Sequence, residues 1–276
     1  MNNTFELKRF NLVFKKLLFE RSLMLYGSFI LVALFTWFIY YATHETYLDA
    51  LSFQMNRMQA FAIGLNLGGI YWVSTGFNYF SNKEEGYNYL ILPASYFEKW
   101  LSVVLLLVVF FLFYCLFFRI LDTLFINYLR QHLVDPFISA DKMHFLYSVK
   151  PLSFWKDNSQ MSLPFPNLGF LTFFNITALM AIGSLYFNKM ALIKTLFSSI
   201  GLYILLYYLS FIIGKILFQT HVRPLPFNLG TMFLSITNEV IILPHPMFLI
   251  YNVFFSFILP IIFWLIALIR LREKEI

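Results

Sequence analysis

Long apolar runs separated by short polar segments dominate the chain. Six stretches reach the roughly 20 residues needed to cross the hydrocarbon core of a bilayer: Ser22–Tyr41, Met58–Tyr79, Trp100–Leu121, Leu168–Phe187, Leu196–Leu217 and Met247–Ile269. None of them alternates apolar and polar residues with a period of two, the pattern of a membrane barrel. Because lipid cannot satisfy free backbone groups, the pattern predicts an all-α polytopic membrane protein with six transmembrane helices.

The residues before the first apolar run predict a helix that lies in the headgroup plane. Apolar side chains recur at spacings of three and four, and basic side chains fall on the opposite side: Leu7, Phe10, Phe14, Leu17 and Leu18 against Lys8, Arg9, Lys15 and Lys16. This is the pattern of an interfacial amphipathic helix, predicted here for residues 1–21. A simple extension of the first span is the alternative.

The segment 80–99 joins the second and third runs and carries strong local signals. Pro93 is expected to end any helix that precedes it, because its ring fixes φ and it has no backbone N–H. Ser95 and Glu98 form the pattern of a capping box, in which each side chain binds the backbone N–H of the other residue. A rigid polar turn beside the membrane could contact a soluble partner; a solvated connector is the alternative.

Small residues recur along the second run at spacings of four and eight: Ala60, Gly64, Gly68 and Gly76. Gly64 and Gly68 form a GxxxG motif, which lets another helix backbone approach closely. The partner helix could belong to the same chain or to a second copy.

Two segments on the opposite side of the membrane are long enough to have structure. Residues 122–167 are polar and contain four prolines, so we expect a small external cap. Arg119 and Asp122 are three residues apart and are predicted to pair on one helix face at the far interface. In residues 218–246, prolines surround an apolar middle, Leu229–Leu243, that is too short to cross and return. We expect a re-entrant or outer-leaflet helical hairpin there.

Composition and charge agree with a membrane protein and set its orientation. Hydrophobic residues make up 60% of the chain and charged residues 12%, against about 25% charge in soluble domains. One side of the predicted topology receives twelve basic residues in short segments and the other side six in longer loops. The positive-inside rule then places both termini in the cytoplasm. The net charge of +6 reflects this asymmetry and contact with membrane lipids, not nucleic acid.

The sequence lacks the common phosphate-binding, nucleophile and zinc-binding motifs. The Gly214-Lys215 pair is followed by Ile216 and lacks the upstream glycine of a phosphate-binding loop, and there is no Gly-x-Ser-x-Gly or His-Glu-x-x-His. Histidines fall on the predicted external side at spacings that match no metal-ligand pattern: His44, His132, His144, His221 and His245. No catalytic, cofactor-binding or metal residue is predicted, so any energy source has to come from a partner.

The order of these parts, and the segment Tyr89–Lys99 reading YLILPASYFEK, resembles the membrane subunits of ABC exporters of the type II permease family, particularly the Bacteroidetes type. The resemblance implies one permease domain over residues 1–276 in a bacterial inner membrane. It also implies a cytoplasmic coupling helix within residues 80–99. The long 122–167 connection departs from the family, in which this loop is usually short.

The resemblance implies a permease subunit, not an enzyme, that works with a second copy or a homologue and a separate cytoplasmic ATPase. It implies that the ATPase docks on the coupling segment: Lys83, Glu84, Glu85, Tyr87 and Asn88, with Glu98 and Lys99 bracing the exit. The low intramembrane charge favours an apolar or amphipathic substrate, such as a lipid, lipid-linked glycan or peptide. An integral-membrane lipid-modifying enzyme that uses the external His and Asp residues is one alternative, and a non-transporting scaffold or sensor is another.

Overall fold

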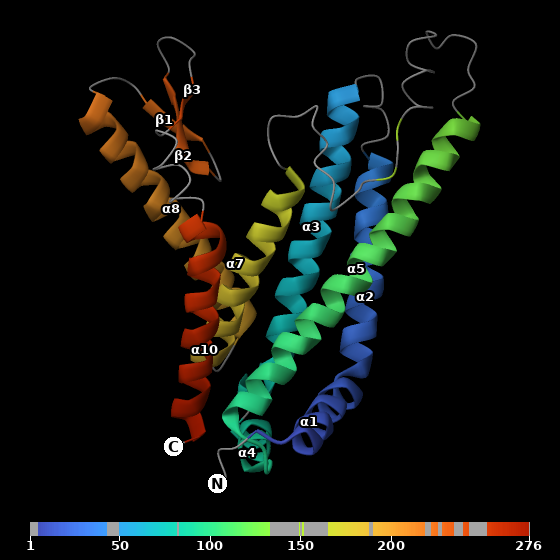
Figure 1. The fold of residues 1–276 in the computed structure, drawn as a ribbon, viewed down its shortest axis with the longest axis vertical. Helices are drawn as coiled ribbons and strands as arrows, with labels where there is room; N and C mark the ends of the chain where they lie inside the picture. Colours follow the sequence, from blue (N-terminus) through green and yellow to red (C-terminus); the bar gives the residue numbers. More distant parts are fainter. Residues whose placement is uncertain are drawn as a thin grey trace.

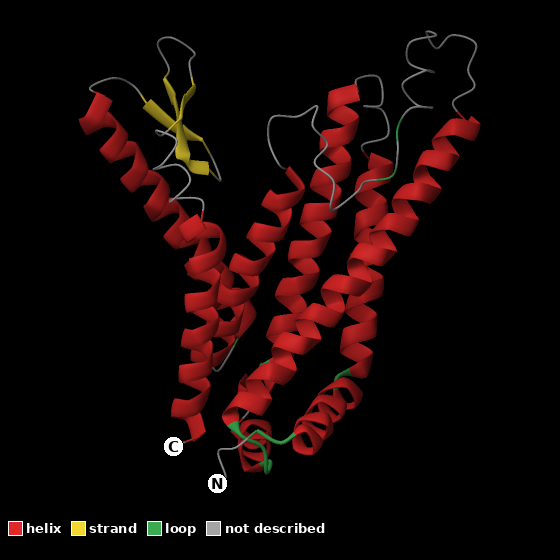
Figure 2. Cartoon of the chain, viewed as in Figure 1, coloured by secondary structure: helices red, strands yellow, loops and turns green. Residues whose placement is uncertain are grey.

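The chain folds as a helical bundle with a small sheet at one end (Figure 1, Figure 2). The computed structural model describes residues 5–42, 50–81, 83–132, 149, 151, 165–187, 190–218, 222–225, 228–234, 240–242 and 253–275. The α-helices are α1 Leu7–Glu20, α2 Ser22–Ala42, α3 Ala50–Gly76, α4 Lys83–Ile91, α5 Tyr96–His132, α7 Phe165–Tyr186, α8 Ala191–Phe218 and α10 Leu259–Glu275. A 3-10 turn, η2 (Asn78–Ser81), precedes α4, and a π-helical turn, η3 (Phe254–Ile258), precedes α10.

Helix α3 lies at the centre of the bundle and packs against α2, α5 and α7. Helix α7 also contacts α8 and α10, and α1 contacts α5. The short helices α1 and α4 lie at one end of the bundle together with the C-terminal end of α10, and the sheet lies at the other end beside α8 (Figure 1). The two ends are therefore built from different kinds of structure.

Three helical segments within the described residues are long and apolar enough to cross a membrane: Ser22–Ala42, Tyr96–Gln131 and Ala191–Leu209. Thr172–Tyr186 is a shorter apolar helix. A membrane protein with a mainly helical fold is thus supported. All six predicted runs contain helix where they are described, while the six-span topology itself stays a prediction.

The predicted helical hairpin at Leu229–Leu243 is not what the structure shows there. Three antiparallel strands in the order β1-β2-β3 occupy the described part: β1 Val222–Leu225, β2 Asn228–Leu234 and β3 Val240–Ile242. In the register, Val222 lies opposite Leu234, and Phe233 lies opposite Val240. β-branched and aromatic side chains favour strands, and the nearby prolines interrupt a helix. The helical prediction therefore holds for the bundle and not for this segment.

Helix α5 is longer than predicted and shortens the external connection. Its 37 residues extend to His132 and span about 55 Å, well beyond the roughly 30 Å of a bilayer core. The Arg130 guanidinium donates a 2.7 Å hydrogen bond to the Val149 carbonyl, which ties one point of the connection to α5. The rest of the cap predicted between α5 and α7 lies outside the described residues.

The glycines of α3 allow it to pack tightly against α5. A Cβ atom added at Gly68 would lie 2.1 Å from Phe110 Cζ, and one at Gly64 would lie 2.1 Å from the Tyr114 hydroxyl. At Gly76 the nearest atom would be Val103 Cγ1, at 2.8 Å. Ala60 is also buried. These small residues therefore pack against the chain's own aromatic and branched side chains.

A buried ion pair joins α2, α3 and α5 near the sheet end of the bundle. The Asp122 carboxylate accepts two hydrogen bonds from Arg57, at 2.8 Å from Nε and 2.5 Å from Nη2, and one from the Tyr40 hydroxyl at 2.8 Å. All three side chains are buried, whereas Arg119 is exposed. The predicted Arg119–Asp122 pair is therefore wrong, because the side of α5 that carries Asp122 faces the bundle interior.

Removing one member of this pair should destabilise the bundle strongly. We expect Asp122→Ala to lower the free energy of unfolding by about 3–5 kcal/mol, because Arg57 would remain buried without its partner. The double variant Arg57→Met with Asp122→Leu should lose less, because no charge remains uncompensated. Thermal unfolding of the chain in detergent, followed by tryptophan fluorescence, measures both effects, with the exposed Arg119→Gln as control. Equal losses in the single and double variants would contradict the assignment.

Candidate functional site

The turn between α4 and α5 is closed by the predicted capping box. The Ser95 backbone N–H donates to Glu98 Oε2 at 2.9 Å, and the Glu98 backbone N–H donates to Ser95 Oγ at 3.3 Å. These bonds satisfy two backbone donors at the start of α5 that have no partner within the helix. The capping box predicted from the sequence is confirmed.

The same carboxylate also holds the start of α1. Glu98 Oε1 accepts the Glu6 backbone N–H at 2.7 Å and lies 3.3 Å from Arg9 Nη2. Glu98 is completely buried, and its charge is compensated by three donors: the Ser95 N–H, the Glu6 N–H and the Arg9 guanidinium. The first turn of α1 and the first turn of α5 are thereby fixed to each other, although 89 residues separate Arg9 from Glu98.

Lys99 secures the other side of the turn. Its Nζ donates a 3.1 Å hydrogen bond to the Leu90 carbonyl near the C-terminal end of α4, and the ammonium lies 5.6 Å from the Tyr89 ring centroid. A cation at this end of a helix is favourable because the last carbonyls carry partial negative charge. Lys99 is fully buried. Glu98 and Lys99 therefore brace the turn and are not part of an exposed surface.

The inner side of α4 packs on η2. The Tyr89 ring stacks on Tyr79 with centroids 4.5 Å apart and an interplanar angle of 8°, and Phe80 meets Tyr89 edge-on at 5.7 Å. A Cβ atom at Gly86 would lie 3.3 Å from the Tyr79 carbonyl oxygen, so a larger residue would require a small shift of this backbone. The Lys274 ammonium lies 4.4 Å from the Phe80 ring centroid, which brings the end of α10 to the same place.

Glu85 attaches α4 to the junction of α1 and α2. Its Oε2 accepts a 2.8 Å hydrogen bond from Arg21, whose guanidinium carbon lies 4.7 Å from the Tyr79 ring centroid. The Tyr79 hydroxyl donates to Glu20 Oε2 at 2.9 Å. Burial raises the pKa of Tyr79 above its ordinary value, and the hydrogen bond to Glu20 adds to this rise. Tyr79 therefore stays protonated and acts as a donor.

The outer side of α4 is open. Glu84, Tyr87, Asn88 and Ile91 occur at spacings of three and four and are all exposed, with Tyr87 67% and Ile91 55% accessible. We call these four residues the α4 outer face. Sequence reasoning identified three of them and missed Ile91, although its position four residues after Tyr87 places both on one helix face. The side chain of Lys83 lies outside the described residues.

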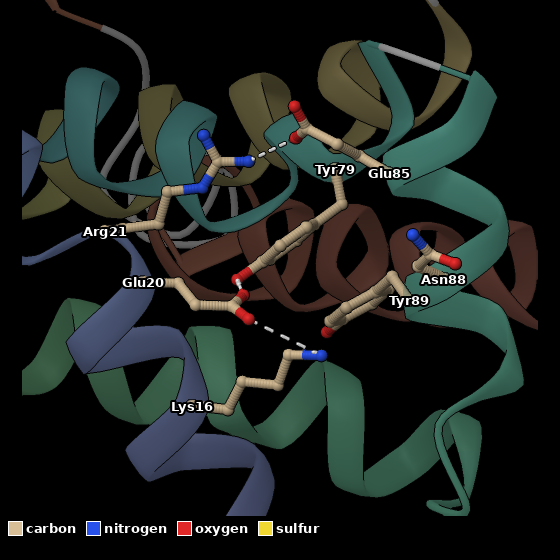
Figure 3. Close-up of a pocket in the computed structure, with 7 residues that line it drawn as sticks. All are labelled: Lys16, Glu20, Arg21, Tyr79, Glu85, Asn88 and Tyr89. Atoms are coloured by element: carbon tan, nitrogen blue, oxygen red, sulfur yellow. Dashed lines mark hydrogen bonds and ion pairs between the residues drawn. The ribbon is translucent and has the colours of Figure 1, made fainter.

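A hollow of about 360 Å³ lies between α1 and α4, on the side of α4 that carries Glu85 (Figure 3). Its walls carry two cations, Lys16 and Arg21, and two carboxylates, Glu20 and Glu85. The stacked rings of Tyr79 and Tyr89 and the side chain of Asn88 complete them. The sequence did not indicate this hollow, because its walls come from α1, η2 and α4 and meet only after folding. We call it the α1–α4 hollow.

The described residues do not meet the requirements of a metal site. No group of three or more His, Cys, Asp or Glu side chains that could hold a metal ion occurs among the described residues. The external histidines, on which the lipid-modifying alternative depends, have side chains outside those residues.

No protein-family model, no curated protein and no solved structure matches this chain. Its function therefore has to follow from the geometry at the α4 end, together with the sequence of the segment that builds it.

Loosening the α4–α5 turn should release α1 before it affects the bundle. We expect Ser95→Ala to cost about 1 kcal/mol through the lost cap. Glu98→Ala should cost more, about 2–3 kcal/mol, because it also removes the acceptor of the Glu6 N–H and one of the partners of Arg9. Hydrogen exchange, read by mass spectrometry, should become faster in residues 6–12 of the Glu98 variant and stay slow in the middle of α5. Unchanged exchange in α1 would show that Glu98 does not hold it.

Proposed function

We propose that the chain is the membrane-spanning permease subunit of an ATP-driven exporter, and that a separate cytoplasmic ATPase docks on the α4 outer face. The observation that carries this proposal is the contrast between the two sides of α4. One side is fixed by Tyr89, Gly86, Glu85 and Lys99, whereas the other presents Tyr87 and Ile91 to solvent. A helix of nine residues with a firm base and an exposed aromatic anchor suits docking to a soluble partner.

The connections of α4 suggest how movement would pass into the membrane part. A push on α4 would reach α5 through the turn at Ser95 and Glu98, and α2 through the Arg21–Glu85 pair. The Lys274–Phe80 contact would carry it to α10. Because packed helices move as rigid elements, such a push would shift whole spans. ATP binding in the partner could in this way be converted into alternating access.

The proposal requires six spans with both termini in the cytoplasm, and a second copy or a homologue to complete the pathway. The order of the helices is compatible with this topology, since α1, α4 and the end of α10 lie together at one end of the bundle (Figure 1). We propose a bacterial inner membrane as the location. The substrate would be apolar or amphipathic, because Asp122 and Arg57 pair with each other inside the bundle.

Docking makes a specific prediction for Tyr87. Tyr87→Ala should weaken capture of the ATPase by roughly thirtyfold or more, because an aromatic anchor at the centre of an interface often contributes about 2 kcal/mol. The tagged chain is purified from its own host, and a subunit with Walker motifs is quantified by mass spectrometry and by ATP hydrolysis. Tyr128→Ala, which changes another exposed tyrosine near the C-terminal end of α5, is the matched control. If both variants retain the ATPase equally, the outer face of α4 is not the docking site.

Orientation can be tested with single cysteines. In a Cys115→Ala background, Gln131→Cys at the end of α5 should react with a membrane-impermeant maleimide in intact spheroplasts. Glu84→Cys on α4 should react only after the membrane is permeabilised. Both positions are exposed on the protein, so burial does not explain a difference. The reverse labelling would place α4 outside the cell and exclude a cytoplasmic ATPase as its partner.

A further inference from the structure

The α1–α4 hollow has the size and position of a lipid headgroup site. At about 360 Å³ it falls in the range of roughly 300–1,000 Å³ that is usual for ligand sites. It lies at the junction of α1 with α2, where the first candidate span begins at Ser22. Helix α1 exposes Leu12 and Phe19 next to its basic residues, as a helix at the interface does. The hollow is therefore expected at the level of the headgroups.

The charges around the hollow are balanced. Lys16 and Arg21 supply two cations, and Glu20 and Glu85 supply two carboxylates (Figure 3). An anionic headgroup would meet two carboxylates, and a cationic ligand would meet two basic groups. A zwitterion, with one group of each sign, matches both pairs.

The two ion pairs that line the hollow differ in strength, and only Arg21–Glu85 joins its two sides. Lys16 Nζ and Glu20 Oε1 are 3.6 Å apart and both side chains are partly exposed, so this pair contributes little and can be exchanged for a ligand at small cost. Arg21 and Glu85 are held at 2.8 Å, and Arg21 is largely buried over Tyr79. A guanidinium has five N–H donors, so Arg21 can keep Glu85 and still donate to a phosphate.

We propose that the α1–α4 hollow binds the phosphoethanolamine headgroup of a membrane phospholipid. The phosphate is held by Lys16 and Arg21. The primary ammonium donates hydrogen bonds to Glu20 and to Glu85. A quaternary choline group has no N–H donor, so it cannot replace the ammonium at the carboxylates. This site stands apart from the proposed transport function, since it needs neither an ATPase nor a substrate.

Bound lipid would fix α1 against α4. Lys16 and Glu20 lie on α1, and Glu85 and Asn88 lie on α4, so a headgroup that contacts both helices joins them through one molecule. The Arg21–Glu85 pair already links these segments, and the headgroup adds contacts on the same path.

Native mass spectrometry of the full chain with lipids of identical acyl chains tests the proposal. Phosphatidylethanolamine should bind roughly fivefold or more tightly than phosphatidylcholine, the difference expected from hydrogen bonds to two partly exposed carboxylates. Phosphatidylglycerol should bind no better than phosphatidylcholine. Soluble phosphoethanolamine should displace the bound phosphatidylethanolamine, which separates headgroup recognition from adsorption of acyl chains to the bundle.

Two variants test which side chains bind the ammonium and which bind the phosphate of the headgroup. Glu20→Gln should abolish the preference for ethanolamine over choline and leave phosphatidylcholine binding unchanged. Lys16→Gln should weaken both lipids equally, because both contain the phosphate. Lys15→Gln removes a cation from the exposed side of the same helix, away from the hollow, and should change the binding of neither lipid.

Equal binding of phosphatidylethanolamine and phosphatidylcholine to the unmodified chain would overturn the proposal even if a variant fails to fold. The same holds if phosphatidylglycerol binds most tightly, or if Lys15→Gln acts like Lys16→Gln.

Discussion

The buried carboxylate of Glu98 is the interaction on which the α4 end of the molecule depends. It binds the backbone N–H of Ser95, which closes the turn into α5, and the backbone N–H of Glu6, which fixes the start of α1. A carboxylate without exposure is stable only when donors surround it, so the turn, the start of α1 and Arg9 have to be in place together. Lys99 completes the arrangement by binding the Leu90 carbonyl. The four residues of the α4 outer face are presented on this fixed base.

The bundle between its two ends is held by a different kind of contact. Aromatic rings of α5, among them Phe110 and Tyr114, lie directly on the glycines of α3, where any side chain would collide. Such close approach gives extensive dispersion contact, which is the main attraction between helices where lipid removes the hydrophobic driving force. The Arg57–Asp122 pair adds a polar connection near the sheet end. In this way α3 and α5 are joined along most of their length, and a displacement applied to the turn at Ser95 would reach the far end of α5 through a continuous rigid helix.

Helix α4 has two faces with separate roles in the proposals made for it. Its outer face is exposed, whereas its inner face meets η2 and the hollow beside α1; Asn88 lies at the border and belongs to both. A headgroup in the hollow and a protein on the outer face would therefore contact the same nine-residue helix from different sides. Since each would stabilise one position of α4, the two binding events would be energetically coupled in both directions. Lipid composition would then influence how firmly the partner is held.

The sequence by itself determined the membrane class, the positions of the long helices, the amphipathic α1 and the capping box at Ser95 and Glu98. These features depend on local periodicity, on backbone chemistry and on side chains at most four residues apart. Only the tertiary structure decided that Asp122 pairs with Arg57 rather than Arg119, that residues 222–242 contain strands, and that Gly64 and Gly68 face α5. It also decided that Glu98 holds α1, and that Lys16, Arg21 and Glu85 surround one hollow. These contacts join residues far apart in the chain, and no local pattern specifies which distant side chain will fill a given space or compensate a given charge.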